Sequence, residues 1–268
     1  MTHLYLSLRN SSISYYRFGS GERVVIAIHG YSNDAQMFDL LEEDLKNNFT
    51  FICIDLPLHG HTRWNKDLLT PKKLQDIIDQ ILNKENLPKT YWLLGFSLGG
   101  RVALSIYQFA PNKVKRLILL APDGLYTNWW NKFWVQTYIG NRTIAFFLKR
   151  PKSAMKLLNW YKKNHLINHK IYCFAQGLLS SKREGKLLYK RWKLMLKMRP
   201  SLHKIGNLIT QYQTPVSLVF GKADGITPSG DAQYFAEKTK PYVAYSKWNA
   251  GHLLLRQKYL PQLISLFK

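Results

Sequence analysis

Strand-like and helix-like segments alternate four times within the first 122 residues, and this alternation constrains the fold more than any other feature of the chain. Continuous apolar runs such as RVVIAIHG and FTFICIDLP predict parallel strands covered on both faces. Apolar residues recur at helical spacing in SNDAQMFDLLEEDLKNN, with Ser32 or Asn33 as a cap, and in TPKKLQDIIDQILNKENLP, where Thr70 and Pro71 mark a helix start. The pattern predicts an α/β fold, with helices on both faces of a mostly parallel central sheet.

The alternation stops after residue 122 and resumes near residue 205. Residues 123–204 contain long helical patterns and many aromatic residues, but no strand-like run. Strand character returns in TPVSLVFGKAD and YVAYSKWN, and the chain closes on HLLLRQKYLPQLISLF, which has a helical pattern. The sequence therefore predicts a core domain of residues 1–122 and 205–268, with a helical insertion of residues 123–204 before the penultimate strand.

The chain is strongly basic, with a net charge of +23, and most of this charge falls in the insertion. Residues 123–204 contain 18 lysines and arginines against two acids, Asp123 and Glu184, so they carry +16 of the total. This segregation favours docking of an acidic carrier protein or anionic substrate, or peripheral contact with an anionic membrane. A lysine-rich solvent face that serves solubility is the alternative. The absence of a helix-turn-helix, zinc-finger or aromatic RNA-binding motif disfavours nucleic acid as a partner.

Composition also indicates the cellular compartment and whether a cofactor or metal is expected. The two cysteines are too few for a disulfide framework, and Cys53 falls in a strand-like run where a small buried residue is expected. Neither a signal-peptide pattern nor a transmembrane run of about 20 apolar residues is evident. We expect a reducing, cytoplasmic setting, and no cofactor or metal, since His59 and His61 have no third ligand in view.

The segment GFSLG, residues 95–99, fits the pattern G-x-S-x-G between a strand and a helix. A strand that turns directly into a helix forces the serine into a strained conformation and leaves no room for side chains at the flanking positions. The Ser97 hydroxyl then stands at a helix N-terminus, where the helix dipole favours developing negative charge. We expect Ser97 to be a nucleophile.

A serine nucleophile needs a base and a carboxylate that orients the base. His252 follows the last strand, in WNAGHLLL, and Asp224 ends the penultimate strand, in LVFGKADGITP. The chain order Ser…Asp…His is the one expected for this architecture. Asp123, which ends the earlier strand VKRLILLAPDG, is the rival acid.

Neighbouring residues are assigned supporting roles. We expect the backbone N–H groups of Tyr31 and Leu98 to bind the oxyanion of the reaction. His29 is expected to hold its loop by hydrogen bonds, and Asp55 and Asp231 to be turn or capping residues.

Five segments, HGYSND, IDLPLHGHT, GFSLGG, GKADGITP and AGHLLL, resemble in order and spacing the conserved blocks of α/β-hydrolase-fold serine hydrolases. The resemblance covers essentially the whole chain, and it assigns the nucleophile, acid and base to Ser97, Asp224 and His252. It implies that residues 123–204 form a cap over the active site. One loop departs from the usual D-x-P-G-H-G, because Leu58 stands where relatives carry the first glycine. We therefore expect the backbone of this loop to differ from that of the family.

A serine at this position excludes similar families with an aspartate nucleophile, the haloalkane dehalogenases and epoxide hydrolases. The expected reaction is cleavage of a carboxylic ester or thioester (or an amide) through an acyl-enzyme. Phe96 and cap tryptophans are expected to contact an acyl substrate: Trp129, Trp130 and Trp134, with Trp160 and Trp192 as further lining residues.

The resemblance to carrier-protein methyl ester esterases and thioesterases favours an acidic carrier as the partner. The alternatives are a lysophospholipase or lipase-like enzyme at anionic membranes, and a nucleic-acid-binding protein with a vestigial hydrolase site.

Overall fold

The computed structural model of the chain describes residues 1–31, 33–65, 68–125, 142, 146, 150–167, 169–178, 182–227 and 229–268. The chain divides into two compact units. The first contains residues 1–125 and 197–268, and the second contains residues 126–196.

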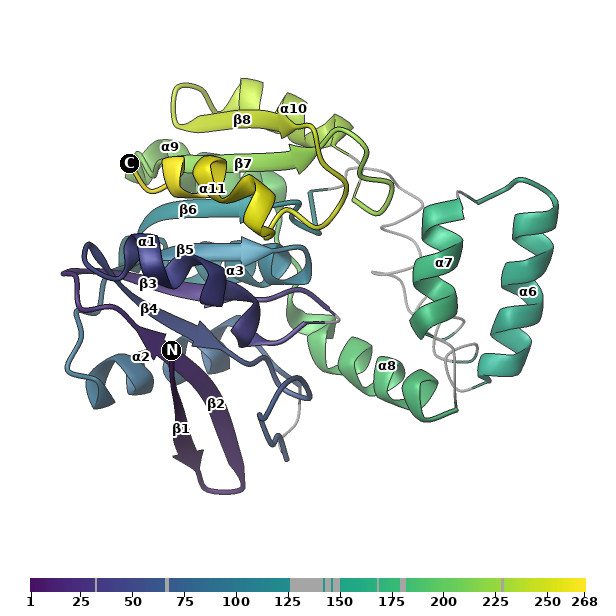
Figure 1. Cartoon of the computed structure of the whole chain (residues 1–268), viewed down its shortest axis with the longest axis horizontal. Coiled ribbons are helices and arrows are strands. Elements are labelled where there is room, and N and C mark those ends of the chain that lie inside the picture. Colours follow the sequence, from purple (N-terminus) through teal and green to yellow (C-terminus); the bar gives the residue numbers. More distant parts are fainter. Residues whose placement is uncertain are drawn as a thin grey trace. The chain divides into compact units, whose positions relative to one another are not determined.

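The first unit is built on one eight-stranded sheet (Figure 1). The strands are β1 (Thr2–Leu8), β2 (Ser11–Phe18), β3 (Arg23–Ile28), β4 (Phe49–Ile54), β5 (Tyr91–Phe96), β6 (Val114–Leu120), β7 (Val216–Gly221) and β8 (Val243–Trp248). Their order is β1-β2-β4-β3-β5-β6-β7-β8, and pairing is antiparallel only where β2 meets β1 and β4. The predicted mostly parallel sheet is confirmed. Strands β3 to β8 therefore all end at the same edge, where ligands bind in such sheets.

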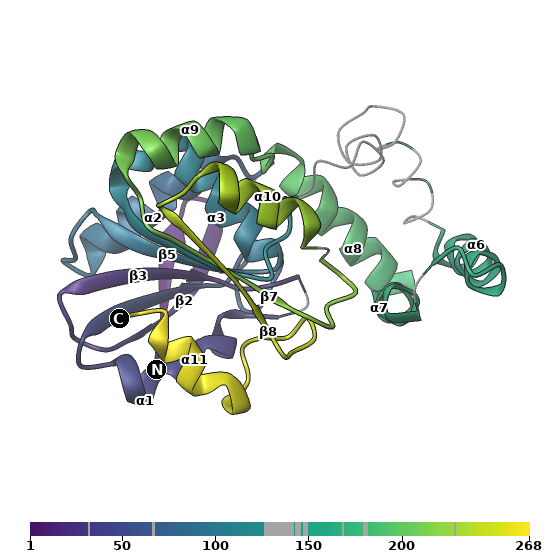
Figure 2. The ribbon, with the colours of Figure 1, turned by 90° about the horizontal axis from the view of Figure 1, so that it is seen from above.

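Helices cover both faces of this sheet (Figure 2). One face is covered by η1 (Ala35–Leu41), α1 (Glu42–Leu45), η4 (Gln257–Tyr259) and α11 (Leu260–Ser265). The other is covered by α2 (Pro71–Lys84), α3 (Leu98–Phe109), α9 (Leu202–Tyr212) and α10 (Gly230–Lys238), with the short η2 (Pro111–Lys113) following α3. This layering buries the apolar strands on both sides, as the continuous apolar runs predict.

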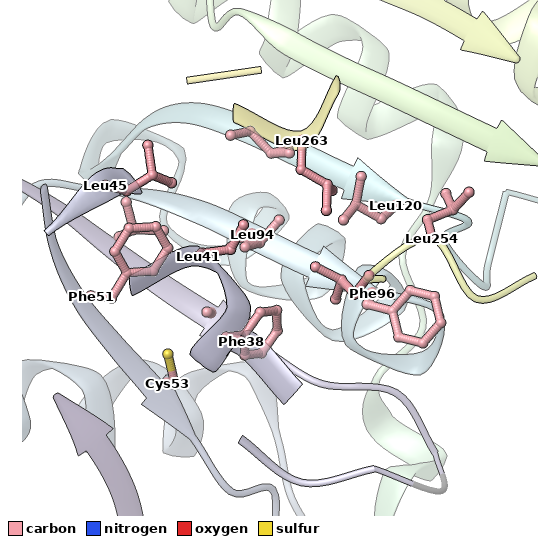
Figure 3. Close-up of a cluster of buried hydrophobic side chains, with 14 of the residues drawn as sticks. Phe38, Leu41, Leu45, Phe51, Cys53, Leu94, Phe96, Leu120, Leu254 and Leu263 are labelled. Carbon is pink, nitrogen blue, oxygen red and sulfur yellow. The ribbon is translucent and has the colours of Figure 1, made fainter. Parts of the chain in front are cut away.

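A large apolar cluster fills the space between the sheet and the helices η1, α1 and α11 (Figure 3). Cys53 lies within it and is completely buried, as expected, and burial raises the pKa of its thiol well above the ordinary value. Leu254 is also completely buried there. Because Leu254 follows His252 by two residues, the cluster anchors the loop that carries the histidine.

Two helix predictions differ in detail from the structure. The segment after β3 forms the 3-10 helix η1 followed by the single turn α1, and its cap is Asp34, not Ser32 or Asn33. Ser32 lies outside the described residues. Asp34 Oδ1 accepts the Gln36 N–H at 3.1 Å, and the distant carboxylate of Asp55 accepts the Ala35 N–H at 2.8 Å. A residue far away in the sequence thus accepts one of the backbone N–H groups that a local capping side chain would otherwise bind.

The start of α2 follows the prediction. Thr70 Oγ1 accepts the Lys73 N–H at 3.1 Å, and Pro71 is in the first turn. The closing helix begins later than its pattern suggests. Residues 252–256 form a loop, and α11 begins at Leu260 with Pro261 in its first turn. Proline lacks an N–H group and is favoured at a helix start, which explains the boundary.

The loop after β4 contains two residues with positive φ, of which only one is glycine. Leu58 has φ +64° and Gly60 has φ +48°, both in the left-handed region. A Cβ atom on Gly60 would lie 2.3 Å from the carboxyl carbon of Asp55. Leu58 therefore adopts the backbone conformation that glycine favours, at a cost of about 1–2 kcal/mol.

The second unit contains helices α6 (Pro151–Lys163), α7 (His169–Leu178) and α8 (Lys182–Leu194). The short η3 (Met195–Lys197) crosses from the second unit into the first. Helix α6 contacts α7, and α7 contacts α8. The limits of this unit, residues 126 and 196, fall inside the predicted insertion of residues 123–204, and α9 belongs to the first unit. Trp129, Trp130 and Trp134 lie outside the described residues.

Candidate active site

Ser97 occupies the turn between β5 and α3 in a strained backbone conformation. Its φ is 51° and its ψ is −115°, a combination that non-glycine residues rarely adopt. The turn is fixed on both sides. The Ser97 N–H donates to the Leu120 carbonyl at 2.9 Å, and the Ser97 carbonyl accepts the N–H groups of Gly100 and Asp123 at 2.9 Å each. The strain predicted from the sequence is confirmed.

The glycines around Ser97 are required by close approach of neighbouring chains. A Cβ atom on Gly99 would lie 2.0 Å from the Ile28 carbonyl oxygen, and one on Gly95 would lie 2.6 Å from the Gly99 oxygen. A Cβ atom on Gly100 would lie 2.4 Å from the side chain of Pro122. These distances confirm that the start of α3 packs directly against the strand ends beside it.

His252 joins two residues that are far away in the sequence. Its Nε2 lies 2.9 Å from Ser97 Oγ, and its Nδ1 lies 2.8 Å from Asp224 Oδ2. All three belong to the first unit. The Asp224 side chain is 1% exposed, whereas the histidine ring keeps some contact with solvent. The structure therefore brings together the three residues that the sequence predicts.

Four hydrogen bonds hold the Asp224 carboxylate. Oδ1 accepts the N–H groups of Ile226 at 2.8 Å and Thr227 at 3.1 Å, and Oδ2 accepts from the Thr227 hydroxyl at 2.6 Å and pairs with His252. Burial by itself raises the pKa of Asp224, but the hydrogen bonds from His252, Thr227 and Ile226 outweigh it, so the pKa lies below the ordinary value. Asp224 is therefore charged near neutral pH.

Thr227 is a residue of this site that is not predicted from the sequence. Its buried hydroxyl donates to Asp224 Oδ2 and also lies 3.3 Å from His252 Nδ1, so it contacts both residues of the His252–Asp224 hydrogen bond. The segment ADGITP contains a local signal, because an aspartate followed by glycine is typical of turns in which the aspartate side chain bonds to the backbone two residues on. That pattern indicates a turn, and it carries no information on the distant histidine.

The loops after β7 and β8 are bonded to each other. The Ala223 N–H donates to the Ala250 carbonyl at 2.9 Å. A Cβ atom on Gly221 would lie 2.1 Å from the Gly251 oxygen, so only glycine allows this approach. Backbone pairing therefore fixes the separation of the loops that carry the aspartate and the histidine.

The two amides predicted to bind an oxyanion leave the sheet from adjacent strands. Strands β3 and β5 are parallel neighbours, with Ile28 opposite Gly95. Tyr31 follows β3, and Leu98 is the first residue of α3, so the Leu98 amide is one of those that have no carbonyl partner within a helix. This topology puts both segments at the Ser97 edge of the sheet.

Phe96 is the last residue of β5 and lies beside His252. Phe96 is buried, and its ring centroid lies 5.3 Å from that of His252. Figure 3 shows Phe96 in the apolar cluster.

His29 is also buried. Its Nδ1 lies 2.7 Å from the Gly30 carbonyl, and its Nε2 accepts the Leu56 N–H at 3.0 Å. The expected role of His29, to hold its loop by hydrogen bonds, is confirmed.

The other carboxylates have different partners. The Asp123 carboxylate lies 3.3 Å from Arg101 Nε, and the histidine pairs with Asp224, so the geometry favours Asp224 over its rival. Asp55 is buried and, besides Ala35, accepts from the Ser14 hydroxyl at 2.7 Å and the His61 N–H at 3.0 Å. Asp55 thus ties its loop together, as expected of a turn and capping residue.

A central parallel sheet with a strained serine at its carboxyl edge defines the class of α/β-fold hydrolases. The family model described as alpha/beta hydrolase fold matches residues 23–256. The chain belongs to this family.

Curated relatives extend over most of the chain. The monoacylglycerol lipase ABHD6 of Homo sapiens is 22% identical, over 87% of this chain and 71% of its own length. The pimeloyl-[acyl-carrier protein] methyl ester esterase of Nitrosomonas europaea is 25% identical, over 85% of this chain and 87% of its own length.

Solved structures share the fold. A thermophilic esterase from Thermogutta terrifontis covers all of this chain and 98% of its own, with a TM-score of 0.69 at 20% identity. The thioesterase domain of the curacin biosynthetic pathway covers 99% of this chain and 98% of its own, with a TM-score of 0.67 at 18% identity. Among the helices of the described residues, none combines the length and apolar character needed to cross a membrane.

Proposed function

We infer that the chain is a serine hydrolase that cleaves a carboxylic ester or thioester through an acyl-enzyme. One observation carries this inference: a single imidazole lies within hydrogen-bonding distance of both the Ser97 hydroxyl and the buried Asp224 carboxylate. In this arrangement His252 is the base, Asp224 orients it, and Ser97 is the nucleophile. The esterase and lipase names of the relatives support the same class of reaction.

The geometry supports a two-step reaction. Ser97 Oγ attacks the carbonyl carbon while its proton moves to His252 Nε2, and the bond to the leaving alcohol or thiol then breaks as that group takes the proton from Nε2. A water molecule next gives a proton to Nε2 and attacks the acyl carbon. Release of the acid returns the proton to Ser97. Throughout, Asp224 stabilises the protonated imidazole through Nδ1.

The negative charge on the carbonyl oxygen develops at the N-terminus of α3. We assign its donors to the backbone N–H groups of Leu98 and Tyr31, which adjacent strands bring to this edge. Such donors are worth about 3–4 kcal/mol each in transition-state stabilisation. Because they belong to the backbone, their position depends on the strained turn at Ser97.

Residues 123–204 are proposed as a cap that selects the substrate. Its tryptophans Trp129, Trp130 and Trp134 are assigned to an acyl pocket, and its charge to an anionic substrate or acidic carrier. The acyl-carrier-protein ester named for one relative, and the thioesterase among the structures, support acyl substrates of this kind.

Labelling with a fluorophosphonate probe tests the chemistry directly. The wild-type protein should be labelled once, and should hydrolyse nitrophenyl esters and acyl thioesters of some chain length. Ser97→Ala should lose labelling and at least a thousandfold in kcat. Labelling that persists in Ser97→Ala, or DNA binding by a protein without esterase activity, would overturn the proposal.

A further inference from the structure

The C-terminal end of α6 presents large apolar side chains to solvent. We call residues 159–166, with the sequence NWYKKNHL, the α6 tip. Every residue of the α6 tip is exposed. Trp160, expected from the sequence to line an acyl pocket, is instead 55% exposed, and Leu166 is 59% exposed. Single exposed apolar side chains are common, but a group of large ones on one short segment is a feature of interaction surfaces.

The α6 tip has an ordered backbone. The Leu166 N–H donates to the Tyr161 carbonyl at 3.0 Å, the His165 N–H donates to the Lys162 carbonyl at 3.1 Å, and His165 has φ 54°. These two bonds and the left-handed residue form the Schellman ending of a helix. The rings of Trp160 and Tyr161 meet edge to face, with centroids 5.3 Å apart. The exposed apolar groups are therefore held in place before any partner binds.

Contacts with α7 hold the α6 tip from the side. The Tyr172 hydroxyl donates to Asn159 Oδ1 at 2.9 Å, and Lys162 Nζ lies 4.0 Å from the centroid of the Tyr172 ring. Figure 1 shows α6 and α7 as neighbouring helices of this unit.

The lysines of the α6 tip make its formal charge positive. The α6 tip contains Lys162 and Lys163 and no acidic residue. In the sequence of the whole second unit, residues 126–196, Glu184 is the only acid against 15 lysines and arginines. A partner of the α6 tip must therefore combine negative charge with a place for exposed aromatic and aliphatic groups.

We propose that the α6 tip binds the surface of an anionic phospholipid bilayer. Tryptophan and tyrosine are suited to the headgroup layer, because each ring has an apolar body and a polar group that bonds to water or lipid. Leu166 enters the boundary with the acyl chains, and the two lysines bind phosphate groups, the balance that peripheral helices use. A nucleic acid would satisfy the lysines alone and leave the leucine in water.

Vesicle co-sedimentation of the full chain tests this inference. At 0.1 M NaCl, the protein should pellet with phosphatidylcholine vesicles that contain 30% phosphatidylglycerol, and much less with phosphatidylcholine alone. Binding should fall at 0.5 M NaCl, since screening shortens the range of the attraction. The inference is independent of the proposed chemistry, so Ser97→Ala should bind as the wild type does.

Two variants separate lipid insertion from general anion binding. Trp160→Ala combined with Leu166→Ala should lower the partition coefficient at least tenfold, and Lys162→Gln combined with Lys163→Gln should lower it about tenfold. All four side chains are exposed, and Lys162→Gln removes only the contact with the Tyr172 ring while the Tyr172–Asn159 hydrogen bond remains, so circular dichroism should show an unchanged fold. Tyr234→Ala is the matched control, because Tyr234 of α10 is 61% exposed and lies beside Lys238. It should stay within twofold of the wild type.

Two results would overturn the inference. One is the absence of binding to vesicles with phosphatidylglycerol at 0.1 M NaCl. The other is salt-dependent binding that the lysine variant loses and the Trp160→Ala, Leu166→Ala variant keeps, because this pattern indicates a surface for acidic protein or nucleic acid.

Discussion

Thr227 is the residue whose effect on the site is easiest to isolate. Thr227→Val keeps the side-chain shape but removes the hydroxyl bonded to Asp224 and close to His252. Since hydrogen bonds to charged groups are worth about 1.5–3 kcal/mol, we expect kcat for an ester to fall between ten- and a hundredfold, with KM little changed.

The conservative variant is the control for this prediction. Thr227→Ser retains the hydroxyl and should recover most of the activity, because a positioning role depends on the hydrogen bond. Equal losses in the valine and serine variants would assign Thr227 to packing alone.

The lowered pKa of Asp224 makes the free energy of unfolding depend on pH in the acid range. Because its pKa is lowered in the folded protein, Asp224 adds stability that is fully present above its ordinary pKa, about 4. This contribution is lost as the pH falls through the lowered pKa. In Asp224→Asn it is absent, so urea midpoints measured between pH 6 and pH 2.5 should decline less steeply than in the wild type. Parallel declines would contradict the prediction.

At the scale of elements, the position of α3 depends on Gly99, which has no side chain in the first turn of the helix. Gly99→Ala sets a Cβ atom 2.0 Å from the Ile28 carbonyl oxygen, a contact that neither backbone can relieve without moving α3. We expect a loss of about 3 kcal/mol or more in the free energy of unfolding, together with lost esterase activity. Denaturant unfolding measures the first effect.

Gly177→Ala is the matched substitution for this test. Gly177 lies in α7, and a Cβ atom there would have no neighbour within 4 Å. Alanine is the better helix former by about 0.5–1 kcal/mol, so the variant should equal or exceed the wild type in stability. A loss of similar size in both variants would show that the crowding at Gly99 is not the cause.

At the scale of the whole molecule, the net charge of +23 acts over distances longer than any contact. Hydrolysis of an anionic acyl thioester should have a kcat/KM that falls as ionic strength rises from 0.02 to about 0.5 M, because the Debye length shrinks severalfold over this range. A neutral nitrophenyl ester should respond little. Equal responses would remove the proposed role of the basic cap in selecting anionic substrates.

Strong local patterns are enough to predict the architecture of the first unit. The apolar runs of β3 to β7, the start of α2 at Thr70 and the turn at Ser97 each depend on residues within a few positions of one another. Local sterics and burial therefore determine them, and the sequence alone reveals them. The chain order of Ser97, Asp224 and His252 also belongs to the sequence.

Contacts between distant segments are decided only by the tertiary structure. The Asp55 carboxylate takes a donor of η1, Thr227 reaches His252 across 25 positions, and Gly221 lets two loops meet. None of these partners leaves a local pattern, because a hydrogen bond across the fold needs only one donor and one acceptor at the right place. The sequence determined which residues are candidates for nucleophile, base and acid. The packing of the strand ends decided which of these residues come into contact, because only the folded structure sets the distances between residues far apart in the chain.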